Sequence, residues 1–149
     1  MKKVITGLFC LLTLLVTSCG TNNNIIINTP NAPAAIGPYS QAVIENGIVY
    51  CSGQIALDPV TNLLVGDTFK EQTTQVFKNI SAVLSAANSN FDCVIKVTVY
   101  MTDLAYFADM NEVYATYFKE GNYPARSAVE VSCLPKGALV EIEVTAYTL

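Results

Sequence analysis

The chain has 149 residues, a formal net charge of −4 at pH 7, 52% hydrophobic and 13% charged residues, and no histidine. The length fits one ordinary domain. Without histidine, Ser-His-Asp and Cys-His nucleophile systems and most zinc sites are excluded. The acidic balance argues against nucleic-acid binding, which depends on basic side chains that neutralise phosphates.

The N-terminus has the pattern of a lipoprotein signal peptide. Two lysines follow Met1, and residues 4–16 form an apolar run that is shorter than the ~20 residues of a membrane-spanning helix. The segment Leu15–Gly20 resembles a bacterial lipobox, whose cysteine is lipidated and becomes the new N-terminus. We therefore expect Cys19 to carry lipid. An ordinary signal peptide with an incidental cysteine is the alternative.

This expectation divides the chain into three parts. Residues 1–18 are the signal peptide, residues 19–24 are the lipidated cysteine and a short tether, and residues 25–149 are the domain. Cleavage removes Lys2 and Lys3 and no acidic residue, so the formal charge moves from −4 to −6. The expected location is the bacterial cell envelope, with the lipid anchor in a membrane, as in a periplasmic or outer-membrane lipoprotein.

The first part of the domain contains three short strand-like runs. Ile25–Ile27 is the first, and the proline-containing segment 28–38 that follows it is an extended loop. Residues 39–43 and 48–52 are two further strands, which are joined by a turn at Glu45–Gly47.

The hydrophobic period then changes to that of a helix. Thr68 and Glu71 have the spacing of a capping box. Behind them an apolar stripe follows helical spacing and consists of Val76, Ile80, Val83, Leu84 and Ala87. A second helix is predicted between a cap at Asp103 and a stop at Gly121. Its expected buried face consists of Phe107, Met110, Tyr114 and Phe118.

Strand-like runs also occupy residues 93–101, 127–133 and 139–147. The order β-β-β-α-β-α-β-β predicts a single α+β domain with both helices on one face of the sheet. In the last strand Glu141 and Glu143 alternate with apolar residues, so they should point away from the helices. We expect Arg126, on the strand before it, to share this helix-free face, which another subunit would cover.

Three cysteines remain after Cys19, and none of them has CxxC spacing. Cys51, Cys93 and Cys133 all lie in apolar, strand-like runs. We expect three buried free thiols.

Arg126 is the only arginine, whereas the other seven basic residues are lysines. A guanidinium binds a carboxylate through two parallel hydrogen bonds, which lysine cannot do. Arg126 together with Glu141 therefore indicates a site for a small anionic substrate. A surface ion pair between the two residues is the alternative.

Several motifs together resemble the RidA/YjgF family in order and spacing. They are Asn31–Ala42, Cys51–Ile55, Pro124–Val131, Leu134–Lys136 and Val140–Glu143, and the likeness extends from about residue 25 to the C-terminus. The resemblance implies a chorismate-mutase-like fold and a homotrimer with sites at its subunit interfaces. The implied activity is hydrolysis of reactive 2-enamine and 2-imine acids, such as 2-aminoacrylate or 2-iminobutanoate, to 2-keto acids and ammonia.

The same resemblance implies roles for individual residues. Arg126 would bind the substrate carboxylate, Glu141 would position and activate the attacking water, and Tyr39 would help to enclose the substrate. The other implied substrate-binding residues are Ser52, Gly53, Asn111 and Ala128. Many members have cysteine at the position of Ala128, whose contribution would come from its backbone carbonyl.

The chemistry agrees with this assignment, because an imine is already electrophilic. Its hydrolysis needs a held carboxylate, an oriented water and one proton-transfer group, without metal or cofactor. The alternative is a non-catalytic trimer that binds small carboxylates. Glu141 favours the enzyme. The expected location favours the binder, because such imines usually arise from pyridoxal-phosphate chemistry in the cytoplasm and the lipidated protein would lie outside it. A ribonuclease conflicts with the acidic charge.

Overall fold

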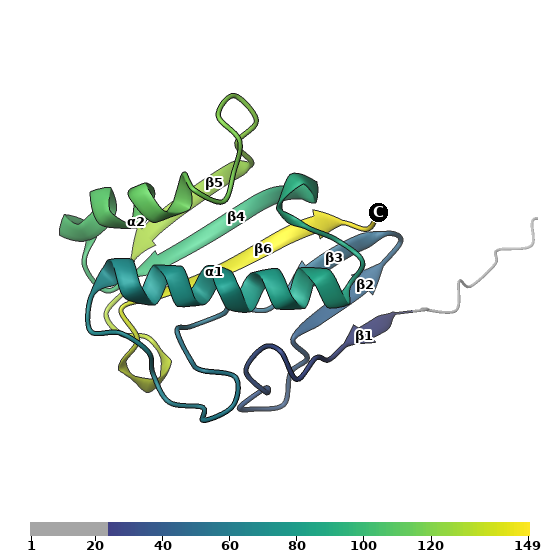
Figure 1. The fold of residues 1–149 in the computed structure, drawn as a ribbon, viewed down its shortest axis with the longest axis horizontal. Helices are drawn as coiled ribbons and strands as arrows, with labels where there is room; N and C mark the ends of the chain where they lie inside the picture. The colour runs from purple at the N-terminus through teal and green to yellow at the C-terminus, as the bar shows by residue number, and fades with distance from the viewer. Residues whose placement is uncertain (1–23) are drawn as a thin grey trace, which may run out of the picture.

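Six strands form one mixed sheet, and two helices pack on one of its faces (Figure 1). The computed structural model describes residues 24–149, so the expected signal peptide and Cys19 lie outside the described residues. The elements are β1 (Ile25–Ile27), β2 (Ala42–Glu45), β3 (Ile48–Cys51), α1 (Phe69–Ala86), β4 (Val94–Met101), α2 (Phe107–Tyr114), β5 (Ala125–Glu130) and β6 (Val140–Tyr147). This confirms the predicted order and the α+β class.

The strand order in the sheet is β1-β2-β3-β6-β4-β5, and only the β4–β5 pair is parallel. The turn predicted between β2 and β3 is present. Asn46 and Gly47 have φ angles of 51° and 77°, the combination that a two-residue hairpin turn of type I′ requires. Helix α2 lies between β4 and β5 in the chain, which gives these parallel strands their crossover connection (Figure 1).

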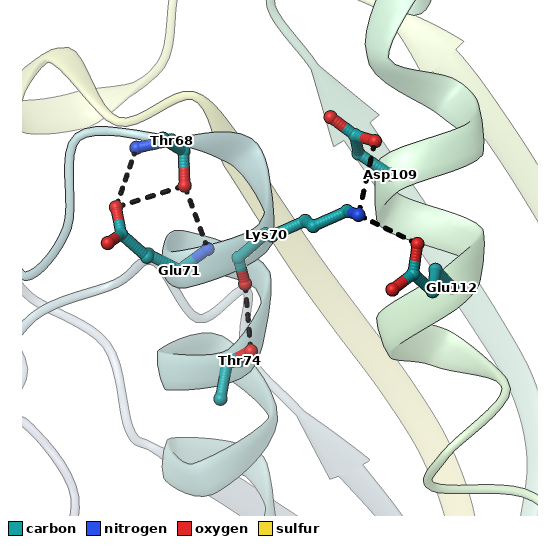
Figure 2. A network of polar contacts seen from close by, with 6 residues as sticks. All are labelled: Thr68, Lys70, Glu71, Thr74, Asp109 and Glu112. Carbon is teal, nitrogen blue, oxygen red and sulfur yellow. Dashed lines mark hydrogen bonds and ion pairs between the residues drawn. The ribbon is translucent and has the colours of Figure 1, made fainter.

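The predicted capping box opens α1. The Thr68 hydroxyl accepts a hydrogen bond from the Glu71 amide, and the Glu71 carboxylate accepts one from the Thr68 amide (Figure 2). All five residues of the predicted apolar stripe are buried against the sheet. On the sheet side they meet Val140, Ile142, Val144 and Ala146 of β6, which are also buried, as their alternation predicts.

Helix α2 is shorter than the sequence analysis expects. Asp103 caps a 3₁₀ turn over Leu104–Tyr106, and α2 then ends at Tyr114 instead of continuing to Gly121. The amides of Thr116 and Tyr117 bond to carbonyls three residues back, so the chain tightens into turns. This brings the Tyr117 ring onto Phe77 of α1, with ring centroids 4.5 Å apart. The helix thus ends before the stop signal at Gly121, in the segment where Tyr117 packs on Phe77.

Ion pairs and ring packing hold α2, and the 3₁₀ turn before it, against α1. Lys70 of α1 bridges to Glu112 at 2.7 Å and to Asp109 at 3.7 Å, both on α2 (Figure 2). Beside this bridge the rings of Phe69 and Tyr106 stack with centroids 4.6 Å apart. The two helices therefore form one layer over the sheet.

The three cysteines are free, as expected, but only two of them are buried. Burial raises the pKa of the Cys51 thiol to about 12, which keeps it protonated and unreactive. The prediction that Cys133 is buried is wrong. Strand β5 ends at Glu130, so Cys133 lies beyond the sheet in an exposed loop. Within residues 24–149, none of the helices has the length and apolar character of a membrane span.

Candidate active site

The loop before β2 is fixed by one buried side chain, Gln41. Its amide nitrogen donates to the carbonyls of Thr29, Ala32 and Pro33 at 3.0, 3.2 and 2.8 Å, and its oxygen accepts from the Thr29 amide. A buried polar side chain with all these partners holds a loop that has no regular structure of its own. The loop presents Tyr39, whose hydroxyl accepts a hydrogen bond from the Ile36 amide at 3.2 Å.

Ser52 and Gly53 follow β3 and shape the site in different ways: Ser52 makes a hydrogen bond, and Gly53 leaves space for Glu141. The Ser52 hydroxyl donates to the carbonyl of Ser40 at 2.6 Å, which ties the end of β3 to the Tyr39 loop. A Cβ atom at Gly53 would lie 1.9 Å from a carboxylate oxygen of Glu141. Position 53 therefore has to be glycine if Glu141 is to keep its place.

Glu141 lies in β6 opposite Tyr100 of β4 and points to the helix-free face of the sheet, as predicted. Its side chain is half-buried. Burial, and then repulsion by the Glu143 carboxylate, raise the pKa of Glu141 above its usual range. Glu143 in turn accepts a hydrogen bond from the Tyr100 hydroxyl at 3.3 Å. The raised pKa makes Glu141 a better proton acceptor than an ordinary glutamate.

These residues line one cavity, which we call the glutamate half-site, with a volume of about 280 Å³. Its lining consists of Ile36, Tyr39, Ser52, Gly53, Ile55, Pro135 and Glu141. The structure thus brings four of the predicted site residues together from three separate stretches of the sequence.

Arg126 and Asn111 lie in a different cavity, which we call the arginine half-site, with a volume of about 480 Å³. Its lining consists of Asn111, Tyr114, Ala115, Tyr123, Pro124 and Arg126. A terminal nitrogen of Arg126 donates to the Asn111 side-chain oxygen at 2.7 Å. Among residues 24–149, no carboxylate lies within salt-bridge distance of this guanidinium. The cation is oriented but not neutralised.

The expectation that Arg126 and Glu141 share one face of the sheet is wrong. Arg126 pairs with Val97, whose side chain is buried under the helices, whereas Glu141 pairs with Tyr100 on the opposite face. Residues that are paired across neighbouring strands point to the same side of a sheet. Arg126 therefore lies under α2, and within one chain the two half-sites are separated by the sheet.

Ala128 follows Arg126 by two residues on the same face and packs against the core rather than into either half-site. Sequence reasoning also missed the aromatic surroundings of Arg126. The ring of Tyr114 lies 4.4 Å from the guanidinium carbon, and that of Phe107 lies 5.4 Å from it. Helical spacing predicts both residues on the buried face of α2. This is confirmed for Tyr114 and wrong for Phe107, which is exposed, and the spacing carries no signal of what either ring contacts.

The two half-sites supply complementary chemistry. The guanidinium can bind a small carboxylate in its plane, and the carboxylate with the raised pKa can accept a proton from water. Both half-sites also carry apolar and aromatic walls, which suit a small organic molecule better than a hydrated ion.

Comparison with known proteins agrees with this geometry. The family described as Endoribonuclease L-PSP matches residues 29–148. The 2-iminobutanoate/2-iminopropanoate deaminase of Rattus norvegicus is 47% identical over 121 residues, which cover 81% of this chain and 88% of that protein.

Two solved structures are also similar. The Rid family protein YyfA of Yersinia pestis has a TM-score of 0.81 and 53% identity, and the match covers 84% of this chain and 99% of that one. TdcF of E. coli with bound serine has a TM-score of 0.79 and 42% identity, with 84% and 99% coverage. The chain therefore belongs to the Endoribonuclease L-PSP family, which is the RidA/YjgF family.

Proposed function

We propose that this protein hydrolyses small 2-imino and 2-enamino acids to 2-keto acids and ammonia. The observation that carries the proposal is the oriented guanidinium of Arg126, which has no acidic partner among residues 24–149. A half-buried cation without a counter-charge is costly unless a ligand supplies that charge. The deaminase name of the relatives and the bound serine of TdcF support a small carboxylate as this ligand.

The proposed reaction begins when the substrate carboxylate binds to the in-plane N–H groups of Arg126. Glu141 accepts a proton from a water molecule while the water oxygen bonds to the imine carbon. The same proton is then passed to the substrate nitrogen. This gives a carbinolamine, which carries –OH and –NH2 on the same carbon. Glu141 then takes the hydroxyl proton and passes it to this nitrogen as the C–N bond breaks, so that ammonia leaves and the oxygen becomes that of the ketone. Glu141 carries both protons from the water oxygen to the substrate nitrogen in this sequence, which starts from the imine form of the substrate.

A homotrimer is part of the proposal, because one chain keeps Arg126 and Glu141 on opposite faces of its sheet. The helix-free face, which carries Glu141, also exposes apolar side chains, namely Ile26, Tyr50 and Val129 at 66%, 52% and 42% exposure. Such a face favours association. A head-to-tail contact that closes into a ring of three would bring the arginine half-site of one subunit to the glutamate half-site of the next.

Anchoring to a membrane through lipid on Cys19 is proposed on the sequence pattern alone. RNA cleavage is the weaker candidate despite the name of the family. The chain has one arginine and an acidic net charge, whereas RNA binding requires a basic surface.

The first prediction tests Glu141 as the base. In an assay that generates 2-aminoacrylate in the presence of the protein, Glu141→Gln should lower kcat for keto-acid release by roughly 10²–10⁴-fold, because glutamine cannot accept the proton. Pyruvate should still bind. The matched control is Glu143→Gln, which changes the same kind of residue on the same face of β6.

Stability provides a second control for Glu141→Gln. Because the folded state raises the pKa of Glu141, ionising this group costs stability once the pH is above that pKa. At neutral pH the variant should therefore have a Tm no lower than that of the wild type. If the wild type turns over 2-aminoacrylate no faster than the spontaneous reaction, the deaminase proposal fails and the carboxylate-binding alternative replaces it.

The pH dependence gives the second prediction. Only ionised Glu141 accepts a proton, so kcat/KM should fall as the pH falls through its raised pKa, at a higher pH than for an ordinary glutamate. Glu143→Gln removes a repelling charge, so the acid limb of the pH–rate profile should move to lower pH. A limb at the same pH in both proteins would contradict the assignment of Glu141 as the base.

The third prediction tests the shared site by mixing subunits. Arg126→Ala and Glu141→Gln proteins should each be nearly inactive. In a random mixture of the two within trimers, about one quarter of the interface sites should combine an intact Arg126 with an intact Glu141. Activity should recover to about that fraction of the wild-type value. A site built within one chain would show no recovery after mixing.

The fourth prediction concerns the anchor. Wild-type protein expressed in a bacterium should sediment with membranes, and Cys19→Ala should be released or remain unprocessed, because the lipid is attached to this thiol. Metabolic labelling with a fatty acid distinguishes lipidation from simple association. Unlabelled wild-type protein in the soluble fraction would contradict the proposal.

A further inference from the structure

The guanidinium of Arg126 is oriented entirely by α2. Asn111 accepts one of its N–H groups at 2.7 Å, and the rings of Tyr114 and Phe107 lie 4.4 and 5.4 Å from its central carbon. A carboxylate in place of these contacts would neutralise the cation and would occupy the N–H groups that a substrate needs. An aromatic face instead holds the plane of the guanidinium and leaves its edge free.

Tyr114 and Phe107 differ in how firmly they can hold this plane. Tyr114 is 4% exposed, whereas Phe107 is 36% exposed. A cation–π contact is stronger when it is desolvated, so the Tyr114 contact is the stronger one. Tyr114 is itself fixed by other rings, with Phe77 at 5.8 Å and Phe118 at 4.6 Å between centroids. It is therefore a rigid platform.

We propose that Tyr114 is a positioning residue, whose ring fixes the plane of the Arg126 guanidinium so that its free edge meets the substrate carboxylate. This inference rests on the proposed function. The aromatic ring of Tyr114 fixes the guanidinium plane, and the Tyr114 hydroxyl does not contribute.

The surroundings of the Tyr114 hydroxyl support a role for the ring alone. It is buried and has no hydrogen-bond partner among residues 24–149. Burial also raises its pKa, so the group stays neutral at physiological pH. A buried hydroxyl without a partner costs stability, and its removal is tolerated where the ring is kept. Tyr114→Phe should therefore retain the function that Tyr114→Leu loses.

The test compares full-length wild type with Tyr114→Phe and Tyr114→Leu, using pyruvate as the binding probe. Tyr114→Leu should raise the Kd for pyruvate and the KM for 2-aminoacrylate roughly 3- to 30-fold, with a much smaller change in kcat. Tyr114→Phe should restore both values to within about twofold of wild type. The matched control is Tyr117→Leu, since Tyr117 packs on Phe77 but does not contact Arg126. It should lower Tm and leave the Kd unchanged.

The single arginine provides a spectroscopic check that the Tyr114 ring lies against the guanidinium in solution. In ¹⁵N-labelled protein the chain gives one arginine Nε–H resonance. The ring face of Tyr114 should shift this resonance away from its position in a denatured sample. The shift should persist in Tyr114→Phe and become smaller in Tyr114→Leu, where only the more distant Phe107 ring remains. If Tyr114→Leu does not fold, Tyr114→Met replaces it, because methionine fills irregular space but has no π face.

Three results would overturn the inference: an unchanged Kd in Tyr114→Leu, an equal loss in Tyr114→Phe, or an equal loss in the Tyr117→Leu control. If the wild type binds pyruvate but does not turn over 2-aminoacrylate, the deaminase proposal fails while the Kd comparison still decides the role of Tyr114. A wild type that does not bind pyruvate would overturn both.

Discussion

The alternation of side chains along β-strands is the constraint on which the proposed function depends. Strand β4 pairs with β6 through Tyr100 and Glu141, and with β5 through Val97 and Arg126. Tyr100 and Val97 are three residues apart, so they point to opposite faces of the sheet. No rotamer change can bring Arg126 and Glu141 together within one chain. A site that uses both residues has to be built from two copies.

The position of Arg126 also depends on contacts far from it in the sequence. Its guanidinium is held by Asn111 and Tyr114 of α2. Helix α2 is in turn held by Lys70 and Phe77 of α1, while Phe69 packs on the 3₁₀ turn before α2. The capping box sets where α1 begins and so where Lys70 lies. Helix packing that would otherwise serve stability alone thus sets the direction in which the only arginine points.

The sequence predicts those parts of the fold that have a clear hydrophobic period. The strict alternation of β6 correctly predicts the outward direction of Glu141, and helical spacing correctly predicts the buried stripe of α1. Strand β5 has no such alternation, because Ala125, Ser127 and Val129 are no more polar than Arg126 and Ala128. Its face is decided by the parallel register with β4, which is a tertiary contact, and so the placement of Arg126 was predicted wrongly. Arg126 and Glu141 were recognisable from their own chemistry, whereas Tyr39, Ser52, Gly53 and Asn111 were recognisable only through the family motifs.

Because the two charges are separated, Glu141 can remain a base and Arg126 can remain free to bind a carboxylate. A direct ion pair between Arg126 and Glu141 would lower the pKa of the carboxylate and fill the edge of the guanidinium. The base would then be weaker and the carboxylate-binding group would be occupied. Placing the charges on opposite faces of the sheet prevents this pairing within a chain, and across the proposed interface a bound substrate would stand between them. In the proposed trimer, the charge that each subunit leaves uncompensated would be compensated only when a neighbour and a substrate are present. Assembly and substrate binding would then be coupled.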